Sequence, residues 1–90
     1  MEEEKHDFEK AEPKVKEFLE VIVKAIVDNP EEVNITEVSS DRTVIFELKV
    51  SESDIGIVIG RKGLHIQAIT TLLNAASGKR RKRAVLEIVE

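Results

Sequence analysis

The 90-residue sequence contains no cysteine, tryptophan or tyrosine and only three phenylalanines. Without cysteine, a disulfide framework and a thiolate metal site are both excluded. Phe8, Phe18 and Phe46 are too few for modules that stack single-stranded bases on several exposed aromatic rings. No apolar run reaches the roughly 18 residues of a membrane span, and the acidic N-terminus lacks the apolar stretch of a secretory signal. We therefore expect a cytoplasmic protein.

The sequence also lacks the common catalytic and cofactor patterns. The spacing of Gly56, Gly60 and Gly63 does not fit the dinucleotide-binding pattern G-x-G-x-x-G, and no Walker Gly-Lys-Ser/Thr occurs. With no cysteine and no paired histidines, the residue types do not indicate a metal site. We expect no enzymatic activity, no metal and no cofactor.

Charge is unevenly distributed along the chain, whose formal net charge is −4. Residues 1–12 carry six acids and two bases, whereas residues 55–86 carry seven bases and no acid. One third of an acidic protein is therefore strongly positive. This asymmetry indicates a local anion-binding face that the net charge conceals.

Apolar spacing predicts the secondary structure of the N-terminal half. A helix begins at Pro13 and ends at Asn29-Pro30, because the residue before a proline is pushed out of the helical region. Residues 32–38 and 43–50 are predicted as the two strands of a hairpin, with its turn at residues 39–42. The apolar face of the helix consists of Val15, Phe18, Leu19, Ile22 and Ile26.

Two further helices are predicted in the C-terminal half. Ser51 and Asp54 match a capping box before a short helix over residues 53–59. A second helix begins after Gly63 and runs to about Ser77, and Gly78 is placed as its left-handed C-cap.

The last predicted strand covers residues 84–90 and completes the element order α-β-β-α-α-β. This order predicts an α+β fold in which a three-stranded sheet has helices packed on one face. Ninety residues leave room for one core. We therefore expect a single domain over residues 13–90, preceded by an acidic extension over residues 1–12.

The two C-terminal helices are joined by Gly60-Arg61-Lys62-Gly63, here called the GRKG turn. Glycine at both ends accepts backbone angles that other residues avoid, and the missing Cβ lets a ligand approach the backbone. The next helix begins here, so its first N–H groups and the positive end of its dipole face the same place. Together with Arg61 and Lys62, this arrangement predicts a clamp for phosphodiester groups.

The turn and its flanks resemble the KH domain in its type II, prokaryotic form. The residues that carry the resemblance are Val58, Ile59, the GRKG turn, Ile66 and Ile69. The single-domain size and the segment Val27–Val33 make the chain similar to small bacterial KH proteins of the KhpA type. The resemblance implies a protein that binds about four nucleotides of single-stranded RNA. It also implies a post-transcriptional regulator or RNA chaperone that pairs with itself or with a second KH protein.

The resemblance further implies a set of RNA-binding residues. The GRKG turn would hold the sugar-phosphate backbone, and four isoleucines would supply an apolar groove floor, although some of them must be core. A basic run in the following loop would add phosphate contacts. The candidates are Gly60, Arg61, Lys62, Gly63, Ile57, Ile59, Ile66, Ile69, Lys79, Arg80, Arg81, Lys82 and Arg83. Leu64 and Thr70 depart from the family pattern, which often has a basic residue at each position.

Alternative interpretations stay open for these features. A Gly-x-x-Gly joint alone is a weak signal, and the basic run, Lys79–Arg83, is also typical of a solvated loop. His65 is either a contact to a base or phosphate or an ordinary exposed helix residue. The alternative function is a protein-interaction adaptor that uses its basic face to dock an acidic partner. The departures at Leu64 and Thr70 favour that alternative.

Overall fold

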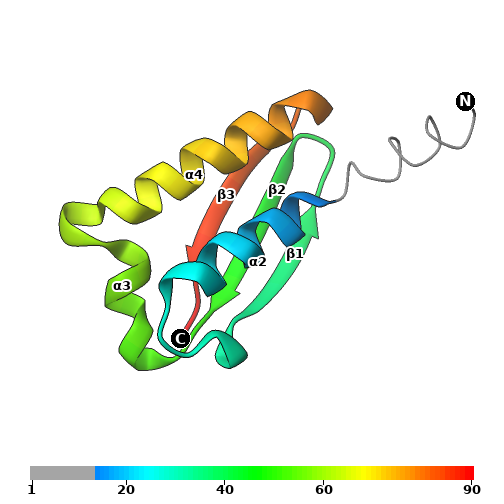
Figure 1. The fold of residues 1–90 in the computed structure, drawn as a ribbon. Helices are drawn as coiled ribbons and strands as arrows, with labels where there is room; N and C mark the ends of the chain where they lie inside the picture. Colours follow the sequence, from blue (N-terminus) through cyan, green and yellow to red (C-terminus); the bar gives the residue numbers. More distant parts are fainter. Residues whose placement is uncertain (1–13) are drawn as a thin grey trace, which may run out of the picture.

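The structure is a computed structural model that describes residues 14–90. The predictions made for residues 1–12 and for Pro13 as a helix start lie outside the described residues. The element order is α-β-β-α-α-β, as predicted (Figure 1). The helices are α2 (Val15–Ile26), α3 (Ile55–Ile59) and α4 (Leu64–Ser77), and the strands are β1 (Asn34–Ser39), β2 (Thr43–Lys49) and β3 (Arg83–Ile88). None of the helices in this part of the chain is long and apolar enough to cross a bilayer.

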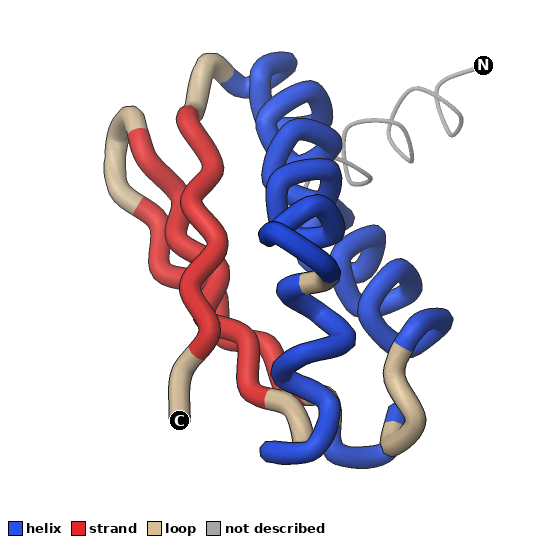
Figure 2. Tube along the Cα trace, turned by 90° about the vertical axis from the view of Figure 1, so that its left-hand side faces the viewer, coloured by secondary structure: helices blue, strands red, loops and turns tan. Residues whose placement is uncertain are grey.

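The three strands form one sheet in the order β1-β2-β3. β1 and β2 are antiparallel, with Ile35 opposite Leu48, and β3 lies parallel to β2, with Leu86 beside Phe46. Parallel strands need a crossover connection, which the α3–α4 segment provides. The helices lie on one face of the sheet, so the predicted two-layer α+β fold is confirmed (Figure 2).

The core lies between the sheet and the helices. Along β2, buried and less buried residues alternate, and Val44, Phe46 and Leu48 point inward, as the spacing predicts. Burial of this apolar surface is the main stabilisation of the fold. The helices contribute Leu19, Val23, Val58, Ile69 and Leu73, each 4% exposed or less.

The apolar face of α2 differs from the predicted one. Leu19 and Val23 are buried, whereas Phe18 is 41% exposed and Ile26 is 36% exposed. Apolar residues occupy most of the circumference of this helix, so more than one helical row fits the spacing rule. Packing selects the row that runs at intervals of four through Leu19, Val23 and Val27. Phe18 therefore remains on the surface.

The connection between α4 and β3 also differs from the prediction. Gly78 has right-handed angles (φ −60°, ψ −27°), and the left-handed residue is Arg81 (φ 58°, ψ 36°). After Ser77 the chain continues in a short 3-10 turn, and the Arg81 N–H donates to the Gly78 carbonyl at 3.0 Å. The predicted C-cap at Gly78 is therefore wrong, because helical hydrogen bonding persists past it and the reversal comes three residues later.

Asn74 joins α4 to β3. Its Nδ2 donates to the Ala84 carbonyl at 3.0 Å, and its Oδ1 accepts the Ala84 N–H at 2.9 Å. The same nitrogen donates to the Thr70 carbonyl at 3.0 Å. Because β3 is an edge strand, the amide side chain satisfies a main-chain pair that has no neighbouring strand.

Asp54 has a role that the sequence analysis missed. Ser51 forms no side-chain cap hydrogen bond, so the predicted capping box is wrong. Asp54 is instead fully buried. Its carboxylate accepts the backbone N–H groups of Asn29 at 3.0 Å and Asp28 at 3.3 Å, and the Asn29 side-chain amide at 3.2 Å. The carboxylate thus ties the α2–β1 connection to the start of α3.

Candidate nucleic-acid interface

The GRKG turn is a sharp reversal between α3 and α4. Gly60 (φ 76°, ψ 168°) lies in a region open essentially to glycine alone, and Gly63 (φ 76°, ψ 16°) is left-handed. Lys62 is also left-handed (φ 57°, ψ 23°), which is uncommon for a residue with a Cβ. The Gly63 N–H donates to the Gly60 carbonyl at 3.0 Å and closes the turn.

Glycine is favoured at the two ends of the turn for different reasons. A Cβ at Gly60 would lie 2.5 Å from His65 Cγ, so both packing and φ exclude a side chain there. A Cβ at Gly63 would meet no atom within 4 Å, so only its φ favours glycine. The space beside Gly63 is open, and a ligand can approach the backbone from that side.

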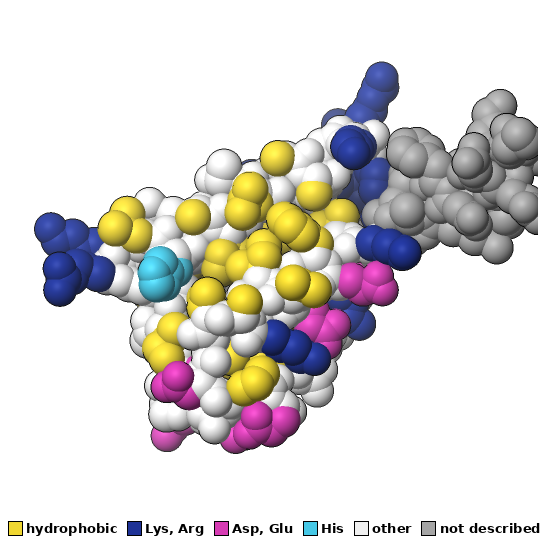
Figure 3. Space-filling view, in the orientation of Figure 1, with side chains coloured by type: hydrophobic (Ala, Val, Ile, Leu, Met, Phe, Trp, Pro, Cys, Tyr) yellow, Lys and Arg dark blue, Asp and Glu magenta, His cyan; other side chains and the backbone are white. Residues whose placement is uncertain are grey.

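The turn forms the exposed corner between α3 and α4 (Figure 1). Arg61 and Lys62 are exposed, and Lys and Arg side chains project from this end of the surface (Figure 3). α4 begins at Leu64, directly after the turn, so the positive end of a 14-residue helix lies there as well. An anion at this corner would be attracted both by the Arg61 and Lys62 side chains and by the positive end of the α4 dipole.

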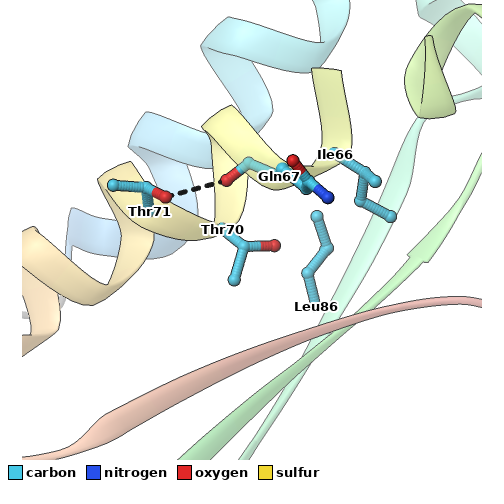
Figure 4. Close-up of a pocket in the computed structure, with 5 residues that line it drawn as sticks. All are labelled: Ile66, Gln67, Thr70, Thr71 and Leu86. Atoms are coloured by element: carbon cyan, nitrogen blue, oxygen red, sulfur yellow. Dashed lines mark hydrogen bonds between the residues drawn. The ribbon is translucent and has the colours of Figure 1, made fainter. Parts of the chain in front are cut away.

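A hollow of about 530 Å³ lies between α4 and β3. α4 contributes Ile66, Gln67, Thr70 and Thr71, and β3 contributes Leu86 (Figure 4). Ile66 and Leu86 give the hollow its apolar surface. The Thr71 hydroxyl donates to the Gln67 carbonyl at 2.9 Å. Within residues 14–90, no hydrogen bond engages the Thr70 hydroxyl or the Gln67 side-chain amide, so these two groups remain available to a ligand.

A protein-family model described as "KhpA/KhpB, KH domain" matches residues 16–88. The chain belongs to the KhpA/KhpB KH-domain family. It is 49% identical over 76 residues to the RNA-binding protein KhpA of Chlamydia pneumoniae, covering 84% of this chain and 97% of the relative. It is 45% identical over 75 residues to the RNA-binding protein KhpA of Clostridium perfringens, covering 83% and 100%. No solved structure matches the chain.

The four isoleucines assigned to the groove floor of this KH domain have different surroundings. Ile66 lines the hollow. Ile69 is 4% exposed and belongs to the core, whereas Ile59 is 38% exposed at the end of α3. Ile57 is half-buried, and its carbonyl is a hydrogen-bond acceptor for His65. Of the four, Ile66 is the one that contributes to the hollow.

Leu86 lines the hollow and was not predicted. Side chains alternate along a strand, so Leu86 shares the helix-facing side of β3 with Ala84. The N–H and C=O groups of successive residues also alternate, pointing toward β2 at one residue and toward the open edge of the sheet at the next. The Arg83 N–H donates to the carbonyl of Arg42, next to β2, so the N–H and C=O of Leu86 turn toward the open edge. The period-two pattern of the last strand is the signal that would have identified this residue.

The basic run of this KH domain lies at the opposite end of α4 from the GRKG turn. α4 has 14 residues, so at 1.5 Å per residue its ends are roughly 21 Å apart. The single basic face expected from residues 55–86 is therefore two groups of cations, seen at the two ends of α4 in Figure 3. The hollow at residues 66–71 lies between them along the helix.

Arg42 joins the basic run although it is distant in sequence. The parallel register places Thr43 beside Arg83, whose N–H donates to the Arg42 carbonyl at 2.9 Å. The Lys82 ammonium donates to the Ser39 hydroxyl. The β1–β2 turn therefore lies against the basic run, an adjacency that follows from strand register and leaves no local signal in the sequence.

Leu64 and Thr70, the two positions expected to depart from the family pattern, differ in their surroundings. Leu64 is 59% exposed directly after the turn and supplies apolar rather than cationic surface there. Thr70 places a hydroxyl in the hollow. The positive charge directly at this end of α4 is therefore that of Arg61 and Lys62.

Proposed function

We propose that this protein binds short single-stranded RNA, about four nucleotides per domain. The sugar-phosphate backbone would lie at the GRKG turn and the bases in the hollow between α4 and β3. The observation that carries the proposal is the exposed turn, with two cations, one helical turn away from a hollow with an apolar floor. Family relatives named RNA-binding proteins support the same conclusion.

Backbone and side chains would act together on the phosphates. Gly63 lets a phosphate approach the main chain, because no atom lies within 4 Å of the place where its Cβ would stand, whereas His65 fills the corresponding space beside Gly60. The first turn of α4 directs its dipole at the same place, as helix N-termini do in other phosphate sites. Arg61 and Lys62 would then pair with phosphate oxygens, Arg61 with the planar geometry that suits two oxygens at once.

The hollow would discriminate only weakly between different bases. Ile66 and Leu86 would contact base faces, while Gln67, Thr70 and the outward backbone groups of Leu86 would accept or donate hydrogen bonds at base edges. A few such contacts give a modest preference rather than a strict sequence code. The domain would therefore bind RNA mainly through phosphate contacts and would accept different bases in the hollow.

One four-nucleotide site offers limited affinity by itself. Two linked sites raise the effective concentration for the second contact and can increase overall binding by about 100-fold or more. We therefore propose that the protein works as a homodimer or with a second KH protein. Its place would be the cytoplasm, as a post-transcriptional regulator or RNA chaperone.

A salt titration tests the proposed phosphate contacts. Each neutralised phosphate of a single strand contributes about −0.7 to the slope of log affinity against log salt. Contacts from Arg61 and Lys62 alone predict a slope of about −1.4, and contacts from the basic run would steepen it. The measurement is fluorescence anisotropy of a labelled RNA octamer between 50 and 300 mM KCl, roughly the range where counterion release is resolved. A flat plot, with the circular dichroism spectrum constant across the series, would contradict the proposed function.

The acidic extension, residues 1–12, is proposed to oppose RNA binding through its charge. It carries six acids and two bases, and RNA is a polyanion, so its removal lowers long-range repulsion. Deleting residues 1–12 is expected to leave the folded state intact and to tighten RNA binding by about twofold to fivefold at low salt. Anisotropy and thermal unfolding measure the two effects. A matched variant replaces the six acids by their amides at full length. Loss of folding after deletion would show that the segment is part of the domain.

A further inference from the structure

His65 contacts the GRKG turn in a way that neither the phosphate clamp nor the hollow uses. Its Nδ1 lies 2.7 Å from the carbonyl oxygen of Ile57. A carbonyl oxygen only accepts, so Nδ1 carries a proton and donates it to this bond. His65 stands in the first turn of α4, and Ile57 stands in α3, so the bond spans the turn between them.

The bond supplies a donor to one of the unpaired carbonyl groups at the C-terminal end of α3. α3 has five residues, and the last carbonyl groups of any helix lack partners within it. The Gly60 N–H donates a hydrogen bond to the Gly56 carbonyl at 2.9 Å. The Ile57 carbonyl is the next in line, and the His65 ring supplies its donor. A side chain of the following helix thus satisfies one of the last carbonyl groups of α3.

The same ring also packs against the backbone of the turn. His65 Cγ lies 2.5 Å from the place where a Cβ of Gly60 would stand. The Cγ, Cβ and backbone nitrogen of His65 therefore fill the space beside Gly60, while the Gly63 N–H donates to the Gly60 carbonyl and closes the turn from within. His65 therefore contacts both Gly60, the first residue of the turn, and α3, the helix that precedes the turn.

This support matters because the turn contains unfavourable backbone. Lys62 has positive φ (57°), and such a conformation in a residue with a Cβ persists only where its surroundings determine it. Glycines also lose the most conformational freedom on ordering. A turn that is already fixed binds its ligand with a smaller loss of entropy.

We propose that His65 is a positioning residue of the RNA site, which holds the GRKG turn in its binding shape without contacting phosphate. This inference rests on the proposed RNA-binding function for its binding readout, but its effect on the turn is measurable without RNA. The ring would act through Ile57 and Gly60, and Arg61 and Lys62 would make the contacts.

Two substitutions separate the hydrogen bond from the bulk of the ring. His65→Leu gives an apolar side chain of similar size and removes the donor. His65→Asn places a donor nitrogen at the same distance along the side chain and restores it. Arg61→Gln with Lys62→Gln serves as the reference for lost phosphate contacts. All variants are full length and are measured by anisotropy with a labelled RNA octamer and by amide hydrogen exchange.

H65L is expected to weaken RNA binding about three- to tenfold, the effect of one net hydrogen bond, with an unchanged salt slope. Exchange of the Gly63 amide should accelerate by a similar factor, while that of the core residue Leu73 should not. H65N should recover most of both losses. The Arg61→Gln, Lys62→Gln pair should instead flatten the salt slope by about 1.4.

The possible results distinguish the inference from the proposed function. Unchanged Gly63 exchange in H65L overturns the inference, whatever RNA does. A salt slope that flattens by about 0.7 in H65L also overturns it, because His65 would then contact phosphate itself. If H65L binds like the parent while the glutamine pair binds weakly, the RNA site stands and the inference fails. If the glutamine pair binds like the parent, the clamp fails, and Gly63 exchange alone decides the role of His65.

Discussion

Replacing Arg61 and Lys62 together by aspartate is expected to weaken RNA binding on the order of 100-fold. Each cation would lose a charge-assisted phosphate contact of about 1.5 kcal/mol, and about 1.4 kcal/mol corresponds to a tenfold change. The new carboxylates would add repulsion. The fold should survive, because both side chains are exposed and aspartate adopts the left-handed angles of Lys62 more readily than most residues.

A charge-matched variant is the control for that experiment. Lys16→Asp with Lys24→Asp makes the same change in net charge on α2, whose two lysines are exposed and do not line the hollow. It should weaken binding by less than about threefold. Anisotropy gives the affinities, and circular dichroism checks the fold. Equal losses in the two pairs would mean that net charge, rather than the turn, governs binding. Unchanged binding after substitution of Arg61 and Lys62 would refute the clamp.

Removing the buried carboxylate of Asp54 is expected to lower the free energy of unfolding by about 3 kcal/mol. Asp54→Ala leaves the backbone N–H groups of Asp28 and Asn29 and the Asn29 amide without their acceptor. Hydrogen bonds to charged groups contribute about 1.5–3 kcal/mol each, and a buried donor without a partner adds a further penalty. Relaxation of the connection toward water recovers part of the loss. Urea unfolding followed by circular dichroism measures the difference.

Two variants grade the effect of Asp54. Asp54→Asn keeps one acceptor oxygen in place and should cost about half as much. Ser53→Ala removes only the exposed contact at 3.5 Å from the Asn29 amide, and should change stability by less than about 0.5 kcal/mol. If Asp54→Ala is too unstable to measure, the asparagine variant still gives a value. A loss below about 1 kcal/mol for the alanine variant would show that water replaces the carboxylate.

The sequence was sufficient to predict the element order and the location of the turn. Both depend on local rules: apolar residues at period two or at helical spacing, and glycines where the backbone reverses. β2 has a clean alternation through Phe46, and its inward face was correct. Gly60 and Gly63 were marked as backbone reversals, and both have positive φ.

Other features depend on which segments meet, and local rules do not contain that information. Phe18 and Leu19 are neighbours on one helix, and only packing against the sheet decided which of them is buried. Asp54 matched a capping pattern, yet its partners lie 25 and 26 residues earlier. The bond between His65 and Ile57 required the geometry of the turn. Arg42 reaches the basic run through strand register.

The paired contacts between Asn74 and Ala84 set the outer limit of the sheet. They occupy main-chain groups on β3 that an added strand from another molecule would otherwise use. Ala84 is therefore closed to an added strand, whereas the outward main-chain groups of Leu86 stay open beside the hollow. The amide of one asparagine thus closes the edge of β3 near the start of the strand, where an extended peptide would otherwise pair with Ala84.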